Sequence, residues 1–337
     1  DHRSGVTVPE TRRLGVAFTP LETRAEVIVE AGVLAEEFGF DHFSIAEGWS
    51  YDSTHLLAEI ARRTERIELI ASVLSVYGRS VGTIAMTAAT LQRLTGGRFT
   101  LGLGASTAAL VEGFHDQQFV RPAARLERYV SQVTALLNGE RLPDPVVGEV
   151  RALRLGSDPA PDLEVLVAAM SPATLDLTAR LADGWLPFFI ASSSLGAVMG
   201  QLADVRPPDL APLRVCPPVL AAVGSNAEKA RAQVAANFVL YMTVMGDIYP
   251  RLVREQGYEK ELELILTANQ RPSDGIVPEG AEELLAAHCI YGAPDDAHAQ
   301  LGTWYEAGAT DVALLMPPNA SFDAIVETMT SFRDDPR

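Results

Sequence analysis

The sequence has few cysteines, no basic block and no long apolar run. Its 337 residues include only two cysteines, Cys216 and Cys289, and their wide separation argues against a disulfide framework or a cysteine-rich zinc site. The formal net charge is −17, and no cluster of Lys or Arg interrupts the acidity. Nucleic-acid backbones and anionic membrane surfaces are therefore not expected partners. No uninterrupted apolar stretch is long enough to span a bilayer.

The first residues, DHRSGVTVPETRR, also lack the apolar core of a signal peptide, and we expect a loose tail over 1–12. Together with the low cysteine content, this indicates a soluble protein in a reducing, cytoplasmic setting.

Several catalytic motifs are missing as well. There is no Gly-x-Ser-x-Gly elbow and no Cys–His pair, and the six histidines show no metal-ligand spacing, so no metal is expected. Glu112 and His115 form half of a di-iron pattern whose other half is absent. The glycines at 102 and 104 fail the dinucleotide fingerprint because Thr107 stands where a third Gly or Ala belongs.

The sequence does contain eight apolar segments that alternate with helical patterns. The predicted strands are 13–19, 40–47, 67–74, 98–104, 163–170, 184–189, 213–223 and 311–316, and the clearest helices are 21–38, 53–64, 82–95, 125–137 and 321–332. The strands are apolar on nearly every residue, as in a parallel sheet that is buried on both faces. Eight such units predict an α/β fold, a single (β/α)₈ TIM barrel over 1–337, with an open doubly wound sheet as the alternative.

Two connections are longer than the rest. The segment 139–162 is rich in Pro and Gly and is expected to be a loop with a short hairpin at 146–155. The segment 224–310 predicts a helical insertion between strands 7 and 8. Its helices run from a capping box at 225–228 to about 246, and around 247–257, 279–288 and 295–307.

In a TIM barrel the active site lies at the carboxyl ends of the strands, and here these ends carry little charge. Glu47 is their only carboxylate, and we expect it to handle a proton, the alternative being that it anchors the loop to Trp49. Arg79 is expected either to pair with an anionic group of a cofactor or to form a solvated salt bridge. His42 is expected to be a structural histidine with satisfied ring nitrogens. The small, uncharged strand ends suit a flat ring system and its phosphate.

The chain resembles the bacterial luciferase-like superfamily of flavin- and deazaflavin-dependent oxidoreductases over nearly its full length. The resemblance is carried by LTGGRFTLGLGAS followed by VEGFHDQQFVRPAARLERYV, by IASVLSVYGRS, by VAAMSPATLDLTARLADGW and by YEAGATDVALLMP. It implies a barrel that holds its cofactor in the mouth, a cis peptide between Ser72 and Val73 behind the ring system, and a homodimer formed through barrel-side helices such as 82–95.

The resemblance also implies the residues that contact the cofactor. Ser72, Val73 and Ser75 would face the ring system, while the backbone around Gly104, Ala105 and Ser106 and around Ala169, Met170 and Ser171 would hold the phosphate. On this interpretation, the side chains missing at Gly102 and Gly104 are replaced by the bound cofactor.

The sequence departs from one branch of the superfamily. Sugar-phosphate dehydrogenases carry an Asp-His pair where Glu47-Gly48 stands here, and a Glu where Thr107 stands. Glucose-6-phosphate chemistry is therefore not expected.

The resulting hypothesis is an oxidoreductase that transfers a hydride between reduced coenzyme F420 and an apolar organic substrate. The alternatives are an FMN-dependent monooxygenase that uses molecular oxygen, and a non-catalytic flavin-binding barrel. Five aromatic residues are candidates for the substrate pocket, although each could equally be ordinary core or rim: Trp49, Tyr51, Tyr77, Phe114 and Phe189.

Overall fold

A computed structural model describes residues 12–271 and 274–333 and shows strands that alternate with helices, as the sequence predicts. The predicted tail over 1–12 lies almost wholly outside the described residues. The first half contains β1 (Arg13–Phe18), α1 (Ala25–Glu37), β2 (His42–Ile45), α2 (Ser53–Arg63), β3 (Glu68–Ser75), α3 (Val81–Thr95), β4 (Phe99–Gly104), α4 (Ala108–Gly113) and α5 (Pro122–Leu137).

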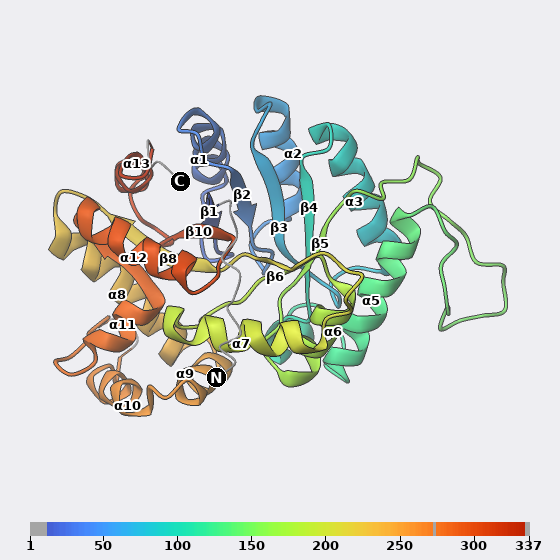
Figure 1. Cartoon of the computed structure of the whole chain (residues 1–337). Coiled ribbons are helices and arrows are strands. Elements are labelled where there is room, and N and C mark those ends of the chain that lie inside the picture. The colour runs from blue at the N-terminus through green and yellow to red at the C-terminus, as the bar shows by residue number, and fades with distance from the viewer. Residues whose placement is uncertain (1–11, 272–273, 334–337) are drawn as a thin grey trace.

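The second half contains β5 (Val165–Val167), α6 (Pro172–Leu181), β6 (Gly184–Trp185), α7 (Ser192–Val205), β7 (Arg214–Val215), β8 (Pro218–Val223), α8 (Ala227–Thr243), α9 (Ile248–Glu255), α10 (Glu259–Ala268), α11 (Glu282–His288), β9 (Cys289–Gly292), α12 (Pro294–Glu306), β10 (Asp311–Met316) and α13 (Phe322–Thr330). Figure 1 shows the connection 139–162 projecting from the body beyond α5, and no strand forms within it.

All strands pair in parallel in one sheet with the order β7-β6-β5-β4-β3-β2-β1-β10-β8-β9. The sheet closes because the predicted strand 213–223 changes partners along its length. Its first part pairs with β6, while the carbonyls of Val215 and Pro217 accept hydrogen bonds from Thr310 and Ala313 beside β10, at 3.0 Å each. The predicted barrel is confirmed.

The structure corrects the prediction for this region in three places. The strand 213–223 is divided at Cys216-Pro217, because two consecutive prolines have no N–H to donate to the ladder. The insertion 224–310 is not wholly helical, since β9 adds to the free edge of β8. The helix α8 is capped by Asn226, which accepts from the amide of Lys229, whereas Ser225 bonds to Glu327 instead of closing the predicted capping box.

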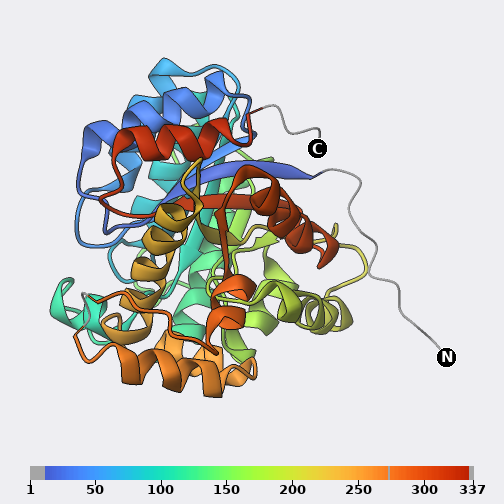
Figure 2. The ribbon, with the colours of Figure 1, turned by 90° about the vertical axis from the view of Figure 1, so that its left-hand side faces the viewer.

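The helices cover the outside of the barrel. Figure 1 shows α8, α10 and α11 gathered on one side, away from α2 and α3. In the view turned by 90°, α13 lies alongside α1, so the first and last helices of the chain are neighbours (Figure 2). No helix in the described ranges is long and apolar enough to cross a membrane.

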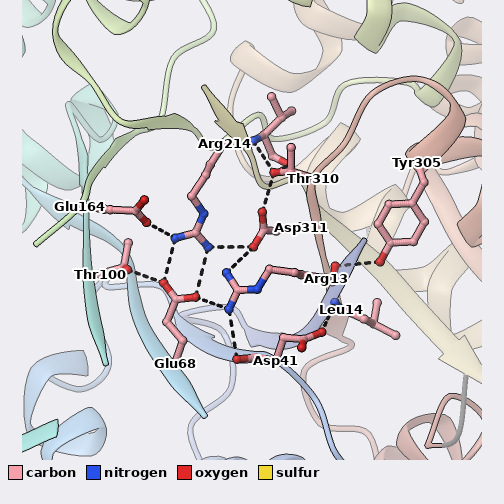
Figure 3. A network of polar contacts seen from close by, with 11 residues as sticks. Arg13, Leu14, Asp41, Glu68, Thr100, Glu164, Arg214, Tyr305, Thr310 and Asp311 are labelled. Atoms are coloured by element: carbon pink, nitrogen blue, oxygen red, sulfur yellow. Dashed lines mark hydrogen bonds and ion pairs between the residues drawn. The ribbon is translucent and has the colours of Figure 1, made fainter. Parts of the chain in front are cut away.

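The amino-terminal end of the barrel interior is closed by a layer of charged side chains (Figure 3). Arg13 bonds to Asp311 at 2.8 Å and to Glu68 at 2.7 Å, and Arg214 bonds to the same two carboxylates at 2.8 and 2.9 Å. Burial alone would raise the pKa of Glu68, but the charge and hydrogen bonds of Arg214 and the charge of Arg13 outweigh it and lower the pKa to about 2. This layer lies at the end opposite the barrel mouth, where TIM barrels carry structural residues and not catalytic ones.

His42 lies beside this layer, and the expectation that it is a satisfied histidine is wrong. Its side chain is buried, and neither ring nitrogen has a hydrogen-bond partner among the described residues. A Cβ placed on Gly15 would lie 2.1 Å from His42 Nδ1, so the glycine makes room for the ring. Burial lowers the pKa of His42, although the charges of Asp311 and Glu68 act in the opposite direction.

Candidate active site

The third strand is irregular at its carboxyl end, where the cofactor was expected. The peptide bond between Ser72 and Val73 is cis, which confirms the prediction. The pairing of β3 with β4 shifts register between Ala71 and Leu74. It resumes at Leu74 opposite Leu103, and just beyond it the amide of Val76 donates to the Gly104 carbonyl at 3.0 Å. Ser72 and Val73 are half-buried and reach the mouth of the barrel.

The two glycines of β4 are explained by this bulge. A Cβ on Gly102 would lie 2.3 Å from the Ala71 carbonyl oxygen, and a Cβ on Gly104 would lie 2.6 Å from Val73 Cγ2. Both contacts are shorter than real Cβ atoms tolerate, so the glycines let β3 approach closely. The interpretation that a cofactor replaces the missing side chains is therefore unnecessary: Val73 occupies the space beside Gly104.

The turn that follows β4 offers hydrogen-bonding groups without partners. Within the described part of the chain, the amides of Ala105, Ser106 and Thr107 donate to no other group, and the hydroxyls of Ser106 and Thr107 are also free. Ser106 has a φ of 62°, in the left-handed region that side chains other than glycine adopt rarely. All three residues are half-buried. This turn, residues 105–107, can bind a polar or anionic group.

The second expected phosphate contact is already satisfied internally. The amides of Met170 and Ser171 donate to Thr174 Oγ1 at 3.2 and 3.0 Å, as part of the capping box that begins α6. The indole of Trp185 donates to the Ala169 carbonyl at 2.9 Å. A phosphate would have to displace Thr174 to reach these amides.

Ser75 also has a local structural role. It is buried, and its hydroxyl accepts from the amide of Tyr77 at 3.2 Å, which shapes the turn after β3. The hydroxyl of Ser72, by contrast, makes no hydrogen bond to any described residue.

Glu47, in the loop directly after β2, is held by an arginine. Arg79 bonds to the Glu47 carboxylate and lies 2.8 Å from Asp52 Oδ1, so one guanidinium bridges both acids. Asp52 also caps α2, accepting from the Thr54 amide at 3.0 Å. Burial alone would raise the pKa of Asp52, but hydrogen bonds from Thr54 and the charge of Arg79 lower it overall. Arg79 is thus paired with two side chains of the protein.

These three side chains line a hollow of about 460 Å³ beside the mouth. Three of the five aromatic candidates also line it, with exposed fractions of 42% for Trp49, 47% for Tyr51 and 58% for Phe114. The remaining lining residues are Gly48, Ser50, Gly78, Ser80, Thr83 and His115.

The other two aromatic candidates lie elsewhere. Tyr77 is buried. Its ring packs at a tilt against that of Phe119, with centroids 5.5 Å apart, and its hydroxyl donates to the Val120 carbonyl at 2.8 Å. Phe189 is buried against Tyr241 and Tyr249, from the helices of the insertion, with ring centroids 4.7 and 5.0 Å away.

Phe189 is also fixed by an unexpected contact. Its φ is 52°, an unusual value for a bulky side chain. Gln256 holds this turn through a 2.9 Å hydrogen bond to the Phe189 carbonyl and a 2.5 Å hydrogen bond from the Ala191 amide. We call this pair of bonds the Gln256 clamp. No sequence motif pointed to it, because the clamp joins segments more than sixty residues apart.

The described residues contain no candidate site for a metal ion. Across 12–271 and 274–333, no group of three or more His, Cys, Asp or Glu side chains is placed to hold a metal ion.

The comparisons with known proteins agree with this architecture. The luciferase-like monooxygenase family matches residues 8–311. The chain belongs to this family. A protein of Mycobacterium tuberculosis, whose name places it provisionally among coenzyme F420-dependent oxidoreductases, is 29% identical over 86% of this chain and 90% of its own length. The protein described here, as a member of the luciferase-like family, is therefore an oxidoreductase.

Solved structures of the same fold include an enzyme that depends on coenzyme F420 and another that is bound to FMN. The coenzyme F420-dependent tetrahydromethanopterin reductase of Methanopyrus kandleri superposes with a TM-score of 0.74 at 16% identity, covering 97% of this chain and 98% of its own. The oxygenating constituent of 3,6-diketocamphane monooxygenase from Pseudomonas putida, in complex with FMN, superposes with a TM-score of 0.71 at 16% identity. The match covers 96% of this chain and 97% of that one. At such identities the likeness shows the fold alone.

Proposed function

We propose that this protein binds coenzyme F420 at the carboxyl-terminal mouth of its barrel and transfers a hydride between the deazaflavin and an organic substrate with a large apolar part. The observation that carries the proposal is the turn 105–107, where three successive amides and two hydroxyls have no partner among the residues that the structure describes. It adjoins the half-buried, uncharged Ser72–Val73 bulge. Such a surface fits a flat ring system with a polar edge.

The roles of the chain's own residues follow from their placement. Val73 and Ser72 form the wall behind the ring, and residues 105–107 donate hydrogen bonds to the cofactor's polar groups. The bound deazaflavin supplies the carbon that gives or accepts the hydride. Glu47, kept in place by Arg79, is positioned at the edge of the hollow to accept a proton or a hydrogen bond from the substrate.

FMN is the second candidate, since the same uncharged surface accommodates a flavin and an FMN-bound structure shares the fold. The reaction would then be a monooxygenation with molecular oxygen. A barrel that binds flavin without catalysing a reaction is the third candidate function.

The two buried, unpaired cysteines support a reducing, cytoplasmic setting for the protein under all three candidate functions.

The test is a titration of the purified protein with F420 and with FMN, followed by absorbance and calorimetry. Ser106→Ala removes a hydroxyl with no partner among the described residues and is expected to weaken F420 binding several-fold. Ser157→Ala, in the exposed connection between α5 and β5 at the end of the barrel opposite the mouth, should leave it unchanged. Tighter binding of FMN than of F420 would favour the monooxygenase. Binding of neither cofactor would contradict the proposal.

A further inference from the structure

The hollow beside the mouth has an unusual combination of charge and aromatic surface. Its lining contains two carboxylates, Glu47 and Asp52, against one guanidinium, Arg79, and the neighbouring His55 lies with Nδ1 3.3 Å from Asp52 Oδ2. Arg79 already bonds to both acids and is directed at them. An entering anion would therefore meet a net negative lining whose one cation is engaged.

The rim of the hollow supplies the second part of the argument. Trp49, Tyr51 and Phe114 are between 42% and 58% exposed, which is high for side chains of this size. The faces of aromatic rings attract cations as well as apolar groups, most strongly for Trp and Tyr. The hydroxyl of Tyr51 donates to the Thr23 carbonyl at 3.2 Å, so this ring is fixed before any ligand arrives.

We propose that this hollow binds a positively charged organic group, such as a substituted ammonium, that is carried on the apolar body of the substrate. The inference rests on the proposed function, because it assigns the hollow to the substrate. Trp49, Tyr51 and Phe114 contact the apolar body of the ligand and the substituents of its ammonium group. Glu47 and Asp52 balance the positive charge of that group. The acidic chain as a whole, at a net charge of −17, adds a long-range attraction for such a ligand.

The test uses two probes of the same shape, choline and its uncharged counterpart 3,3-dimethylbutan-1-ol. Calorimetry in low-salt buffer is expected to show choline binding at least about tenfold tighter, and added NaCl is expected to reduce this preference. Asp52→Asn keeps a side chain that can cap α2 and should remove most of the preference. Glu59→Gln, an exposed acid on α2 outside the hollow, is the matched control and should keep it.

Tryptophan fluorescence locates the binding. Trp185 and Trp304 are each only 2% exposed, so a change in emission on adding choline reports Trp49. Equal affinities for the two probes, an unchanged preference in Asp52→Asn, or heat of binding without a change in emission would each overturn the inference. Separate titration of F420 distinguishes the two failures: a protein that binds F420 but not choline contradicts this inference alone, whereas choline binding without either cofactor contradicts the proposed function.

Discussion

Val73 lies across from Gly104 so closely that a Cβ on the glycine would be 2.6 Å from Val73 Cγ2. The glycine therefore belongs to the packing of the bulge and does not by itself indicate a ligand. Residues 105–107, which directly follow, carry amides and hydroxyls that bond to none of the described residues.

Gly104→Ala is expected to lower the free energy of unfolding by about 1–3 kcal/mol, because the added methyl overpacks the bulge. Val73→Ala combined with Gly104→Ala should recover part of this loss, since Val73 Cβ is at an ordinary 3.6 Å. Denaturant unfolding of the single and double variants measures both effects. Lost cofactor binding with unchanged stability would instead return the glycine to a role in ligand contact.

Glu47→Gln is expected to spare cofactor affinity and to reduce kcat by about 10²-fold or more, if the carboxylate handles a proton. Arg79 keeps Asp52 as a partner, so its charge is not left unpaired. Once a substrate has been found, steady-state kinetics alongside F420 titration provide the measurement. Turnover equal to that of the parent would reduce Glu47 to an anchor for the loop to Trp49.

Gln256→Ala removes the Gln256 clamp from a turn that contains a left-handed Phe189. The Ala191 amide and Phe189 carbonyl then lose their partner, and we expect a loss of about 1–3 kcal/mol in unfolding free energy. Gln201→Ala, an exposed glutamine on α7, is the control and should change stability little. A similar effect of both changes would show that the clamp contributes no more than an ordinary surface residue.

Stability is expected to fall on acidification because of His288. Burial lowers the pKa of its ring to about 4, despite the hydrogen bond with the Leu284 carbonyl. The unfolded chain, with a pKa near 6.5, takes up the proton first. The neutral ring therefore contributes full stability above about pH 6.5, and this contribution, on the order of 3 kcal/mol, is lost as the pH falls to about 4.

Unfolding experiments at a series of pH values test this, with His288→Leu as the variant. The parent should lose more stability between pH 6.5 and 4 than the variant does. His42, whose pKa is also lowered, contributes in the same direction in both proteins and cancels in the comparison. Parallel pH curves would show that His288 does not titrate in this way.

The chain is expected to form a homodimer through α3, where Met86 is 59% and Leu94 is 44% exposed. Exposed apolar side chains on one helix are suited to an interface. Sedimentation at micromolar concentration should give twice the chain mass, and Met86→Glu together with Leu94→Glu should shift the protein toward monomer. A parent protein that sediments as a monomer contradicts the prediction.

Local patterns predicted the elements that depend on local sequence. Apolar runs located eight strands, whereas the cis bond was predicted from the resemblance of the segment around Ser72 to the luciferase-like superfamily. The four-residue β9 was missed, because an apolar run this short between two helices carries no periodicity.

Side-chain partners were much harder to predict. The proximity of Val73 to Gly104, the occupation of the Met170 amide by Thr174 and the burial of Tyr77 depend on contacts that no spacing reveals. The charged layer did leave a signal. Arg13, Glu68 and Asp311 stand at the first positions of apolar strands, which is costly unless the charges meet one another.

The bonds between Arg13 and Asp311 join residues 298 positions apart, at the first and last strands of the barrel. A ribosome makes Arg13 early and Asp311 late, so Arg13 is without this partner during almost the whole of translation. Until β10 has emerged, β1 has an open edge, and Arg13 and Arg214 lack the Asp311 carboxylate that they share. The nascent chain therefore exposes a strand edge that invites pairing with other polypeptides, and protection by a chaperone would matter most just before synthesis ends.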